Sequence, residues 1–430
     1  MVLYQYLKGS QSPATWHEQA SLNEAMQWIG FGYRPARRTW YEFRDRVGGV
    51  IEDLHEQLIH RGINEGLVDP TTGVQDGTFI AACASRHRMV NQSKLEKRRE
   101  LLARILGGSH KEQDEIPKWV PPTFSGREDL AGRMEVAAKV LAERIAKNEA
   151  KPKSKRKDSA KITVSLTDPD APLGRDKLKT YRPLYTVQYV VDPASYLTLS
   201  FQCEASASDA GTLAPMIDKT QRIVGGALQR MLADAAYSSI MDLRDAAERG
   251  VELLAPVPAN GSTTNRKSAS GAEQIPRDQF IYNAASNTYT CPAGEVLNYQ
   301  YREKMERQGD KVLYQSCYQC SPSLCAGCLL AATCLGGLGA RKIKRLEGEE
   351  LIEAQKAKMQ REDIKACYRV RGQTVERGFG DAKGNRGVTR FHGRGLARAR
   401  AETGLLVLAQ NLLILDKLER NAANSSKATT

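Results

Sequence analysis

The order of apolar patterns between residues 162 and 257 constrains the fold of this chain most strongly. Alternating apolar and polar residues predict strands over 185–192 and 196–204, and the turn sequence DPAS joins them as a hairpin. The other expected elements are a strand over 162–168, a helix over 211–224, an apolar segment over 228–234, a helix over 238–250 and a strand over 251–257. Strands interleaved with helices in this order indicate an α/β fold with a mixed sheet.

Helical patterns flank this region. Residues 1–63 carry apolar residues at helical spacing, and long helical patterns resume after residue 346 and end in a leucine-rich helix. An apolar run around Val74 and Phe79 predicts a strand. The remaining expectations are a basic helix over 86–108, a long helix over 127–147, a flexible basic linker over 147–161, a loop over 260–271 and a disordered tail over 421–430.

The charge balance indicates a polyanionic partner. Lys and Arg number 63 against 50 Asp and Glu, a net charge of +13, for which nucleic acid is the first candidate and an unrelated basic enzyme the alternative. No apolar run reaches the ~18 residues of a membrane span, and the N-terminus lacks a secretory apolar core. We therefore expect a cytosolic protein with no membrane partner.

Three acidic residues stand out by position. Asp76 lies in a strand-like segment, Asp234 ends an apolar segment, and Glu376 lies on a helix. Carboxylates at strand ends and on a packed helix can meet at one sheet edge and hold two divalent metals for phosphoryl transfer. Their hard oxygen ligands suit Mg²⁺. The alternative is that three unrelated carboxylates have been selected from the 50 in the chain.

Other carboxylates have competing interpretations. Asp168 and Asp170 also follow an expected strand, and Asp168 is an alternative metal ligand. Glu402 lies in the last helix among basic residues, where a salt bridge is expected. Asp209 is expected to cap the N-terminus of the following helix.

Basic residues surround Glu376. Between residues 369 and 400 there are nine Lys or Arg and only two acidic residues, Glu376 and Asp381. Such an envelope suits a phosphate backbone held beside a metal site, and a solvated helix face is the alternative. The envelope includes Arg377, Lys383, Arg386, Arg390, Arg394, Arg398 and Arg400.

A second basic segment, RPARRTW, lies in the N-terminal region. It places three arginines beside a tryptophan, as a DNA-contacting turn would. It is equally compatible with a solvated helix start.

Six of the nine cysteines fall between residues 291 and 334. They form the patterns CPAG, CYQC and CAGC, followed by Cys334. Two C-x2-C pairs in a reducing compartment indicate zinc rather than disulfides. Since tetrahedral zinc takes four ligands, the pattern alone does not select among the six, and reduced, unliganded thiols are the alternative.

Five segments, in chain order, resemble the DDE transposases of bacterial insertion sequences. They are QDGTFIAACASRHR, SLTDPDA, YTVQYVVD, LADAAYSS and YRVRGQTVERGFGDAKGNRGVTRFHGRG. The resemblance covers about residues 20–420 and is greatest to the subgroup with a large insertion before the catalytic glutamate. It implies an RNase H-like catalytic domain interrupted by an insertion domain.

The resemblance also assigns roles to individual residues. It makes Asp76, Asp234 and Glu376 the catalytic ligands of Mg²⁺ or Mn²⁺. It implies that Tyr368, Arg371 and Lys383 hold DNA near the cleavage site. Together with Arg377, Arg386, Arg390 and Arg394 of the basic envelope, they form the predicted DNA-binding set. It selects Cys291, Cys325, Cys328 and Cys334 as the ligands of a structural Zn²⁺.

The predicted domain organisation follows from these segments. It comprises a helical N-terminal region with a DNA contact (1–72), the first part of the catalytic domain (73–257) with a helical insert and basic linker (81–161), a cysteine-rich insertion (258–345), and the second catalytic part with C-terminal helices (346–430).

The predicted function is Mg²⁺-dependent cleavage of element ends and strand transfer into target DNA. The partners implied are double-stranded DNA, as terminal inverted repeats and target, and a second copy in a homodimer. The expected location is the cytoplasm, at the nucleoid. The alternatives are a decayed or domesticated transposase that only binds DNA, and an RNase H-fold nuclease with another task.

Overall fold

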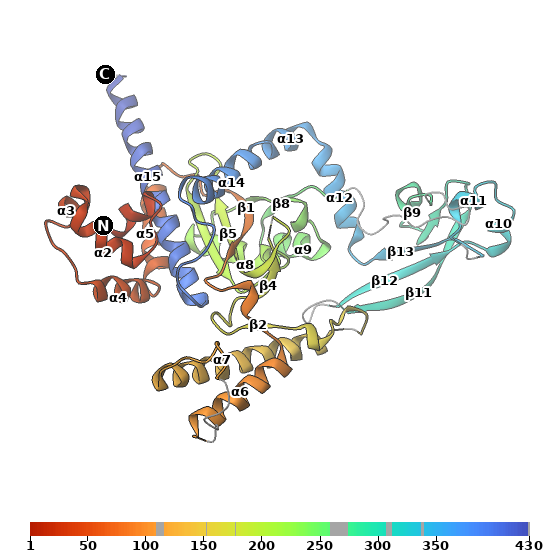
Figure 1. The fold of residues 1–430 in the computed structure, drawn as a ribbon. Helices are drawn as coiled ribbons and strands as arrows, with labels where there is room; N and C mark the ends of the chain where they lie inside the picture. The colour runs from red at the N-terminus through yellow and green to blue at the C-terminus, as the bar shows by residue number, and fades with distance from the viewer. Residues whose placement is uncertain are drawn as a thin grey trace. The chain divides into compact units, whose positions relative to one another are not determined.

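The computed structural model describes residues 1–108, 116–151, 153–176, 178–258, 274–306, 312–336 and 339–428 (Figure 1). The chain forms two compact units. The first unit contains Met1–Tyr237, Arg244–Ala255 and Arg361–Thr430. The second unit contains Ser238–Leu243 and Pro256–Gln360.

A mixed sheet forms the centre of the first unit. Its strands are β1 (Thr72–Ala81), β4 (Leu173–Arg175), β5 (Tyr181–Val191), β6 (Thr198–Glu204), β7 (Arg230–Leu232) and β8 (Glu252–Leu254). Along the sheet the order is β6-β5-β1-β7-β8, with β4 paired to the start of β5. β5 runs antiparallel to β1 and β6, whereas β7 runs parallel to β1 and β8. The α/β class and the predicted hairpin of β5 and β6 are confirmed.

Helices cover this sheet. They are α8 (Leu213–Ile223), α14 (Val370–Gly380) and α15 (Leu396–Ala428), and α9 (Ile240–Glu248) follows β7 and precedes β8 in the chain. α8 and α15 pack on β5 and β6, and α14 packs on β1 and β5. Because side chains alternate along a strand, Gln75 and Asp76 point to opposite faces of β1. Gln75 contacts Thr212 before α8, and Asp76 contacts Arg371 of α14.

The N-terminal region is helical, as the sequence predicts. It contains α1 (Val2–Leu7), α2 (Pro13–Leu22), α3 (Glu24–Ile29), α4 (Arg37–Val47) and α5 (Ile51–Asn64). Tyr6, Trp16 and Trp40 are buried together as an aromatic cluster. α5 packs on α15 at Gly404, where a Cβ would lie 2.6 Å from Cγ1 of Ile51. A larger residue at Gly404 would therefore force these helices apart.

A helical insert follows β1. It contains β2 (Met89–Val90), α6 (Gln92–Leu106), α7 (Phe124–Glu149) and β3 (Val164–Ser165). Leu102 and Met134 belong to a core of its own between α6 and α7. The predicted strand over 162–168 is shorter than expected, and it pairs only with β2, outside the main sheet.

The basic segment predicted as a flexible linker folds back on α7. The side chain of Asn148 accepts a hydrogen bond from the backbone N–H of Lys157 (2.9 Å) and donates one to its carbonyl (2.7 Å). Two hydrogen bonds to one residue hold this end of the segment against the helix, which charge composition alone did not predict.

The second unit is built on another sheet, of order β13-β12-β11-β10-β9. Its elements are β9 (Ile281–Asn283), β10 (Thr288–Thr290), β11 (Val296–Glu306), β12 (Val312–Gln319), α10 (Pro322–Ala326), α11 (Ala331–Cys334), β13 (Lys342–Leu346) and α12 (Glu349–Gln360). The unit continues past the predicted boundary at residue 345 because α12 packs within it, with Glu353 paired to Arg345 at 2.6 Å. The loop predicted over 260–271 lies outside the described residues.

The long helices predicted after residue 346 are α12, α13 (Glu362–Tyr368), α14 and α15. α15 continues to Ala428, so the prediction of a disordered tail from residue 421 is wrong for most of that segment. The stretch from 421 to 428 contains no Gly or Pro to end a helix. Among the described helices, none combines the length and apolarity that a membrane span requires.

Candidate active site

Asp76 and Asp234 lie side by side on two neighbouring inner strands of the main sheet, at the edge where β7 ends. The parallel pairing of β1 with β7 matches Thr72, Gly73 and Val74 with Arg230, Met231 and Leu232. The same register, continued by two residues, brings Asp76 level with Asp234 just after β7 ends. Neighbouring parallel strands thus deliver two carboxylates from distant parts of the chain to one place.

Arg371 contacts both carboxylates. Its Nη2 lies 3.4 Å from Oδ1 of Asp76 and 4.0 Å from Oδ2 of Asp234. The Arg371 side chain is 15% exposed, whereas those of Asp76 and Asp234 are 23% and 43% exposed. The guanidinium therefore sits behind two carboxylates that solvent still reaches, and compensates their charge.

Two further contacts dock α13 and α14 beside this pair. The hydroxyl of Tyr368 donates to the carbonyl of Ala233 (3.0 Å), next to Asp234. Phe379 stacks on Tyr189, which lies opposite Asp76 in the β1–β5 register, with ring centroids 4.6 Å apart. These contacts fix the position of the helices against the strand ends.

Lys383 reaches the same face of β1 from the π-helical turn after α14. Its Nζ donates to Oγ1 of Thr78 (2.6 Å) and to the carbonyl of Phe79 (3.0 Å). Thr78 follows Asp76 by two residues and so shares its face of the strand. The predicted Tyr368, Arg371 and Lys383 therefore all approach the segment around Asp76 and Asp234.

Glu376 lies on α14 between Arg371 and Lys383, and it is exposed. Its neighbours Thr374 and Val375 are buried toward the sheet, which leaves Glu376 on the flank of the helix. In the described residues no group of three or more His, Cys, Asp or Glu side chains is arranged to hold a metal ion. The structure thus pairs the two aspartates and places Glu376 on the helix docked beside them, and the triad stays a prediction.

A buried polar network supports the two aspartates from the opposite face of the sheet. The hydroxyl of Tyr237 donates to Oε1 of Gln188 (2.9 Å), and Nε2 of Gln75 also donates to that oxygen (3.3 Å). Gln75 and Gln188 are fully buried, and burial raises the pKa of Tyr237. Because Tyr237 follows Asp234 closely and Gln75 precedes Asp76, the network ties the two segments together.

Asp209 belongs to this network rather than to a helix cap. Its Oδ1 accepts from Nε2 of Gln188 (2.7 Å), and α8 has no side-chain cap hydrogen bond, so the predicted capping role is wrong. A Cβ on Gly77 would lie within 2.5 Å of both Asp209 and Gln188. Because Gly77, next to Asp76, has no side chain, the side chains of Asp209 and Gln188 can occupy this space. The glycine of the QDGT segment and the polar Gln188 in an apolar strand were the signals in the sequence.

The competing carboxylates have other partners. Asp168 is fully buried and accepts from the hydroxyl of Tyr185 (2.6 Å), which lies opposite Ile80, farther along β1 than Asp76. Glu402 is 4% exposed and accepts from the backbone N–H groups of His392 and Gly393. Burial raises the pKa of Glu402 to about 7. Glu402 therefore does not form the expected salt bridge. Its buried carboxyl group instead binds the backbone of the loop at His392 and Gly393.

The predicted basic envelope divides into anchored and exposed members. Arg386 pairs with Asp381 (2.5 Å), and Arg377 lies over the ring of Tyr196 (4.6 Å). Arg390 and Arg394 are exposed. Arg386 is therefore anchored in the fold and Arg377, although exposed, contacts a ring, whereas Arg390 and Arg394 remain at the surface.

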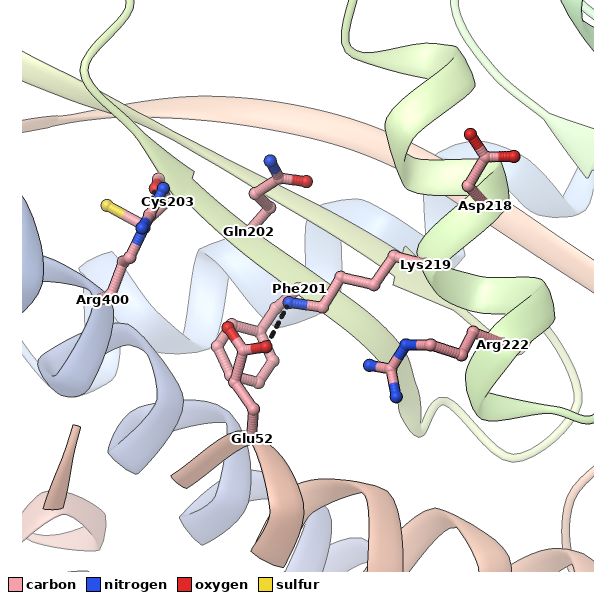
Figure 2. A pocket seen from close by; sticks show the side chains of 8 residues that line it. All are labelled: Glu52, Phe201, Gln202, Cys203, Asp218, Lys219, Arg222 and Arg400. Carbon is pink, nitrogen blue, oxygen red and sulfur yellow. Dashed lines mark hydrogen bonds and ion pairs between the residues drawn. The ribbon is translucent and has the colours of Figure 1, made fainter. Parts of the chain in front are cut away.

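A separate cavity of about 410 Å³ opens beside β6, α5, α8 and α15 (Figure 2). Lys219 pairs with Glu52 (3.0 Å), and Arg222 pairs with Glu56 (2.7 Å). Its cations are thus largely compensated. The cavity lies at strand β6, two strands from Asp76, and it takes no part in the arrangement of the two aspartates.

The cysteines of the second unit gather around a small apolar cavity. It is lined by Cys291, Cys320, Cys325, Cys328 and Cys334. Burial and a hydrogen bond with Cys325 raise the pKa of Cys320 to about 12. Cys317 lies instead in the middle of β12, where it pairs with Lys344 of β13. The four predicted zinc ligands therefore share one cavity, and Cys320 joins them there.

Residues 290–415 match the model of a family described as a transposase DDE domain. The matched interval contains the cysteine cavity, Tyr368, Arg371, Glu376 and Lys383. Over this interval the chain is similar to the DDE domain of transposases, which agrees with the resemblance predicted from the sequence. No curated protein and no solved structure matches the chain.

Proposed function

We propose that this protein is an insertion-sequence transposase that cuts DNA at the ends of its element and joins the cut strands to target DNA. The observation that carries the proposal is the pairing of Asp76 and Asp234, held by Arg371 at one sheet edge. The transposase match supplies the class of reaction. A bacterial origin and the subgroup with a large insertion are parts of the same proposal.

The topology of the main sheet supports an RNase H-like catalytic domain. Three antiparallel strands, β6, β5 and β1, are followed in the sheet by two strands parallel to β1. In this order the first strand of the chain lies at the centre, and the carboxyl end of its parallel neighbour carries the second aspartate.

Carboxylate oxygens that remain open to solvent fit Mg²⁺ or Mn²⁺, which bind hard oxygen ligands and keep part of their water. In our proposal Asp76, Asp234 and Glu376 hold the metal. Bound there, it would activate a water or a 3′-hydroxyl and stabilise the leaving oxygen. Arg371 orients the two aspartates, and Tyr368 and Lys383 fix the helix that carries Glu376.

DNA binding is proposed for the residues around this helix. Arg390 and Arg394 are exposed cations suited to phosphate contacts, and Arg377 and Arg386 extend the same charge. Cleavage of two ends further implies a homodimer on double-stranded DNA, with terminal inverted repeats and target both bound. Since that DNA lies in the nucleoid, the proposal implies a cytoplasmic, nucleoid-associated protein.

A structural Zn²⁺ is proposed for the second unit, with Cys291, Cys325, Cys328 and Cys334 as ligands. The support is the shared apolar cavity, because thiolates in a water-poor site are the preferred ligands of structural zinc. Cys320 lines the same cavity and could exchange with one of the four.

The proposed reaction is tested by nicking and strand transfer on DNA carrying the native flanking ends. Asp76→Asn, Asp234→Asn and Glu376→Gln should each reduce Mg²⁺-dependent nicking by about 10³-fold or more while DNA binding persists. Asp416→Asn, an exposed carboxylate on α15, is the matched control and should cut normally. A wild-type protein that binds these ends but never nicks them would overturn the enzyme reading in favour of a DNA-binding protein.

A further inference from the structure

Aromatic side chains are exposed where α3 ends and α4 begins, in a segment that we call the aromatic loop (residues 28–38), which includes the last residues of α3 and the first residues of α4. Trp28 is 81% exposed, Phe31 98% and Tyr33 71%. By contrast, Trp16 and Trp40 of the same helical region are buried. Exposed apolar groups that cluster in this way mark an interaction surface.

Backbone hydrogen bonds order this loop. The N–H of Gly32 donates to the carbonyl of Gln27 (2.8 Å), and that of Tyr33 donates to the carbonyl of Gly30 (2.8 Å). Phe31 has a φ of 51°, a left-handed conformation that residues other than Gly seldom adopt. The ring of Phe31 is therefore presented to solvent by a defined backbone.

The charge of the loop has one sign. Between Glu24 and Glu42 the chain has no acidic residue but contains Arg34, Arg37 and Arg38. Arg38 pairs with Glu42 (2.6 Å). Arg34 and Arg37 are exposed, and neither forms an ion pair within the described part of the chain. The aromatic rings thus lie beside two uncompensated cations.

We propose that the aromatic loop binds DNA, with Arg34 and Arg37 on the phosphates and the rings of Trp28 and Phe31 stacked on unpaired or unstacked bases. Arginines provide sequence-independent attraction to the backbone, and aromatic rings stack on any base. A solvated helix start, the other interpretation of this segment, would leave the exposed rings unexplained. The choice of DNA as partner rests on the proposed function.

Charge complementarity selects DNA over a second copy of this chain. In a two-fold contact the same patch meets itself, so Arg34 and Arg37 of both copies would lie together without an acidic partner from the loop. Like charges across an interface disfavour association. A polyanion meets no such repulsion.

Binding is tested with a fluorescent duplex of about 30 base pairs, fully paired or with a short central bubble, at about 0.15 M salt. Phe31→Ala and Trp28→Ala should each weaken binding of the bubbled duplex by about 5- to 150-fold, the range that base stacking on one ring provides. Phe124→Ala removes a ring that is 61% exposed elsewhere in the first unit, and it should bind normally. Since Phe31 is almost fully exposed, its variant should keep the wild-type melting temperature.

Phosphate contacts have a different signature. Arg37→Ala should reduce the slope of log affinity against log salt by about 0.9, whereas Phe31→Ala should leave that slope unchanged. Unchanged affinity of both ring variants for the bubbled duplex would overturn the proposal. A change in oligomeric state with unchanged DNA affinity would also overturn it, in favour of self-association.

The loop and the proposed reaction can fail separately. A wild-type protein that nicks DNA, with ring variants that bind normally, rejects the loop and keeps the reaction. A protein that never nicks, with ring variants that lose DNA affinity, rejects the reaction and keeps the loop.

Discussion

The edge around Asp76 and the cysteine cavity of the second unit are both candidate metal sites, and they differ in the chemistry of their ligands and in their surroundings. The aspartates are partly open to solvent and share the cation Arg371. The cysteines line a small cavity with a largely apolar wall, to which Glu295 and Arg341 also contribute. Hard ligands that solvent reaches suit a metal that must meet substrate, whereas enclosed thiols suit a metal that only stabilises the fold.

The largest effect is expected at the aspartate edge. Arg371→Ala removes the cation that orients Asp76 and Asp234, so their mutual repulsion is no longer offset. We expect Mg²⁺-dependent nicking to fall by about 10²- to 10³-fold, as when one charge-stabilising group is lost. Zinc content of the protein, measured by elemental analysis, should not change. Arg371→Ala with wild-type nicking would show that the shared cation has no part in the reaction.

In the second unit we expect the opposite result, a loss of zinc with little loss of nicking. Cys325→Ser should lower the bound zinc and the melting temperature of that unit, because structural zinc contributes folding free energy directly. Cys317→Ser, in the middle of β12 and away from the cavity, is the matched control for zinc content. Nicking should fall far less than in Arg371→Ala. Equal zinc content in Cys325→Ser and the wild type would remove the zinc proposal.

A smaller effect is expected from the buried polar network of Tyr237, Gln188 and Gln75, which supports the two aspartates. Tyr237→Phe removes the hydrogen bond to Oε1 of Gln188 and leaves a buried acceptor short of one donor. The free energy of unfolding, from urea titration, should fall by about 1–3 kcal/mol. Because the network ties Tyr237 to the segment before Asp76, nicking should fall as well, with DNA affinity unchanged. Normal nicking in a destabilised variant would make the network purely structural.

The smallest effect is a pH dependence within the first unit. The pKa of Glu402 is raised to about 7 in the folded protein, so between about pH 4.5 and 7 the folded state binds more protons than the unfolded state. Glu402 therefore lowers stability as pH rises through this window. As pH rises through this window, the free energy of unfolding of Glu402→Gln should increase relative to that of wild type by up to roughly 3 kcal/mol. Urea unfolding at several pH values measures this difference.

His55 makes the comparison with wild type necessary. Burial lowers its pKa to about 4, so it raises stability as pH rises from about 4 to 6.5, in the opposite direction. The difference between Glu402→Gln and wild type cancels this contribution. A difference that stays constant with pH would show that Glu402 does not titrate there.

Local patterns predicted much of the fold. The β5–β6 hairpin, α8, α9 and β8 follow from side-chain periodicity and turn residues, which act over a few positions. Two local predictions were less accurate. The strand expected over 162–168 is shorter than predicted, and most of the tail expected to be disordered after residue 421 is helical. Whether a short apolar run joins a sheet depends on partners elsewhere in the chain, and β3 found only β2.

The candidate site was predicted unevenly. The acidic residues and their basic neighbours are visible in the sequence, and the resemblance to DDE transposases gave them roles that the family match supports as a class. The network of Gln75, Gln188, Tyr237 and Asp209 was missed. Its hydrogen bonds join residues from separate elements, so no local pattern marks them.

The sequence by itself determined the chemical character of this protein: a basic chain, carboxylates after apolar segments, clustered thiols, and aromatic residues among arginines. Tertiary structure alone decided that Asp76 and Asp234 are neighbours, that Arg371 lies between them and that Phe31 is exposed while Trp40 is buried. The physical reason is that residue type and periodicity are local, whereas the register of β1 against β7 and the docking of α14 are set by packing between distant segments.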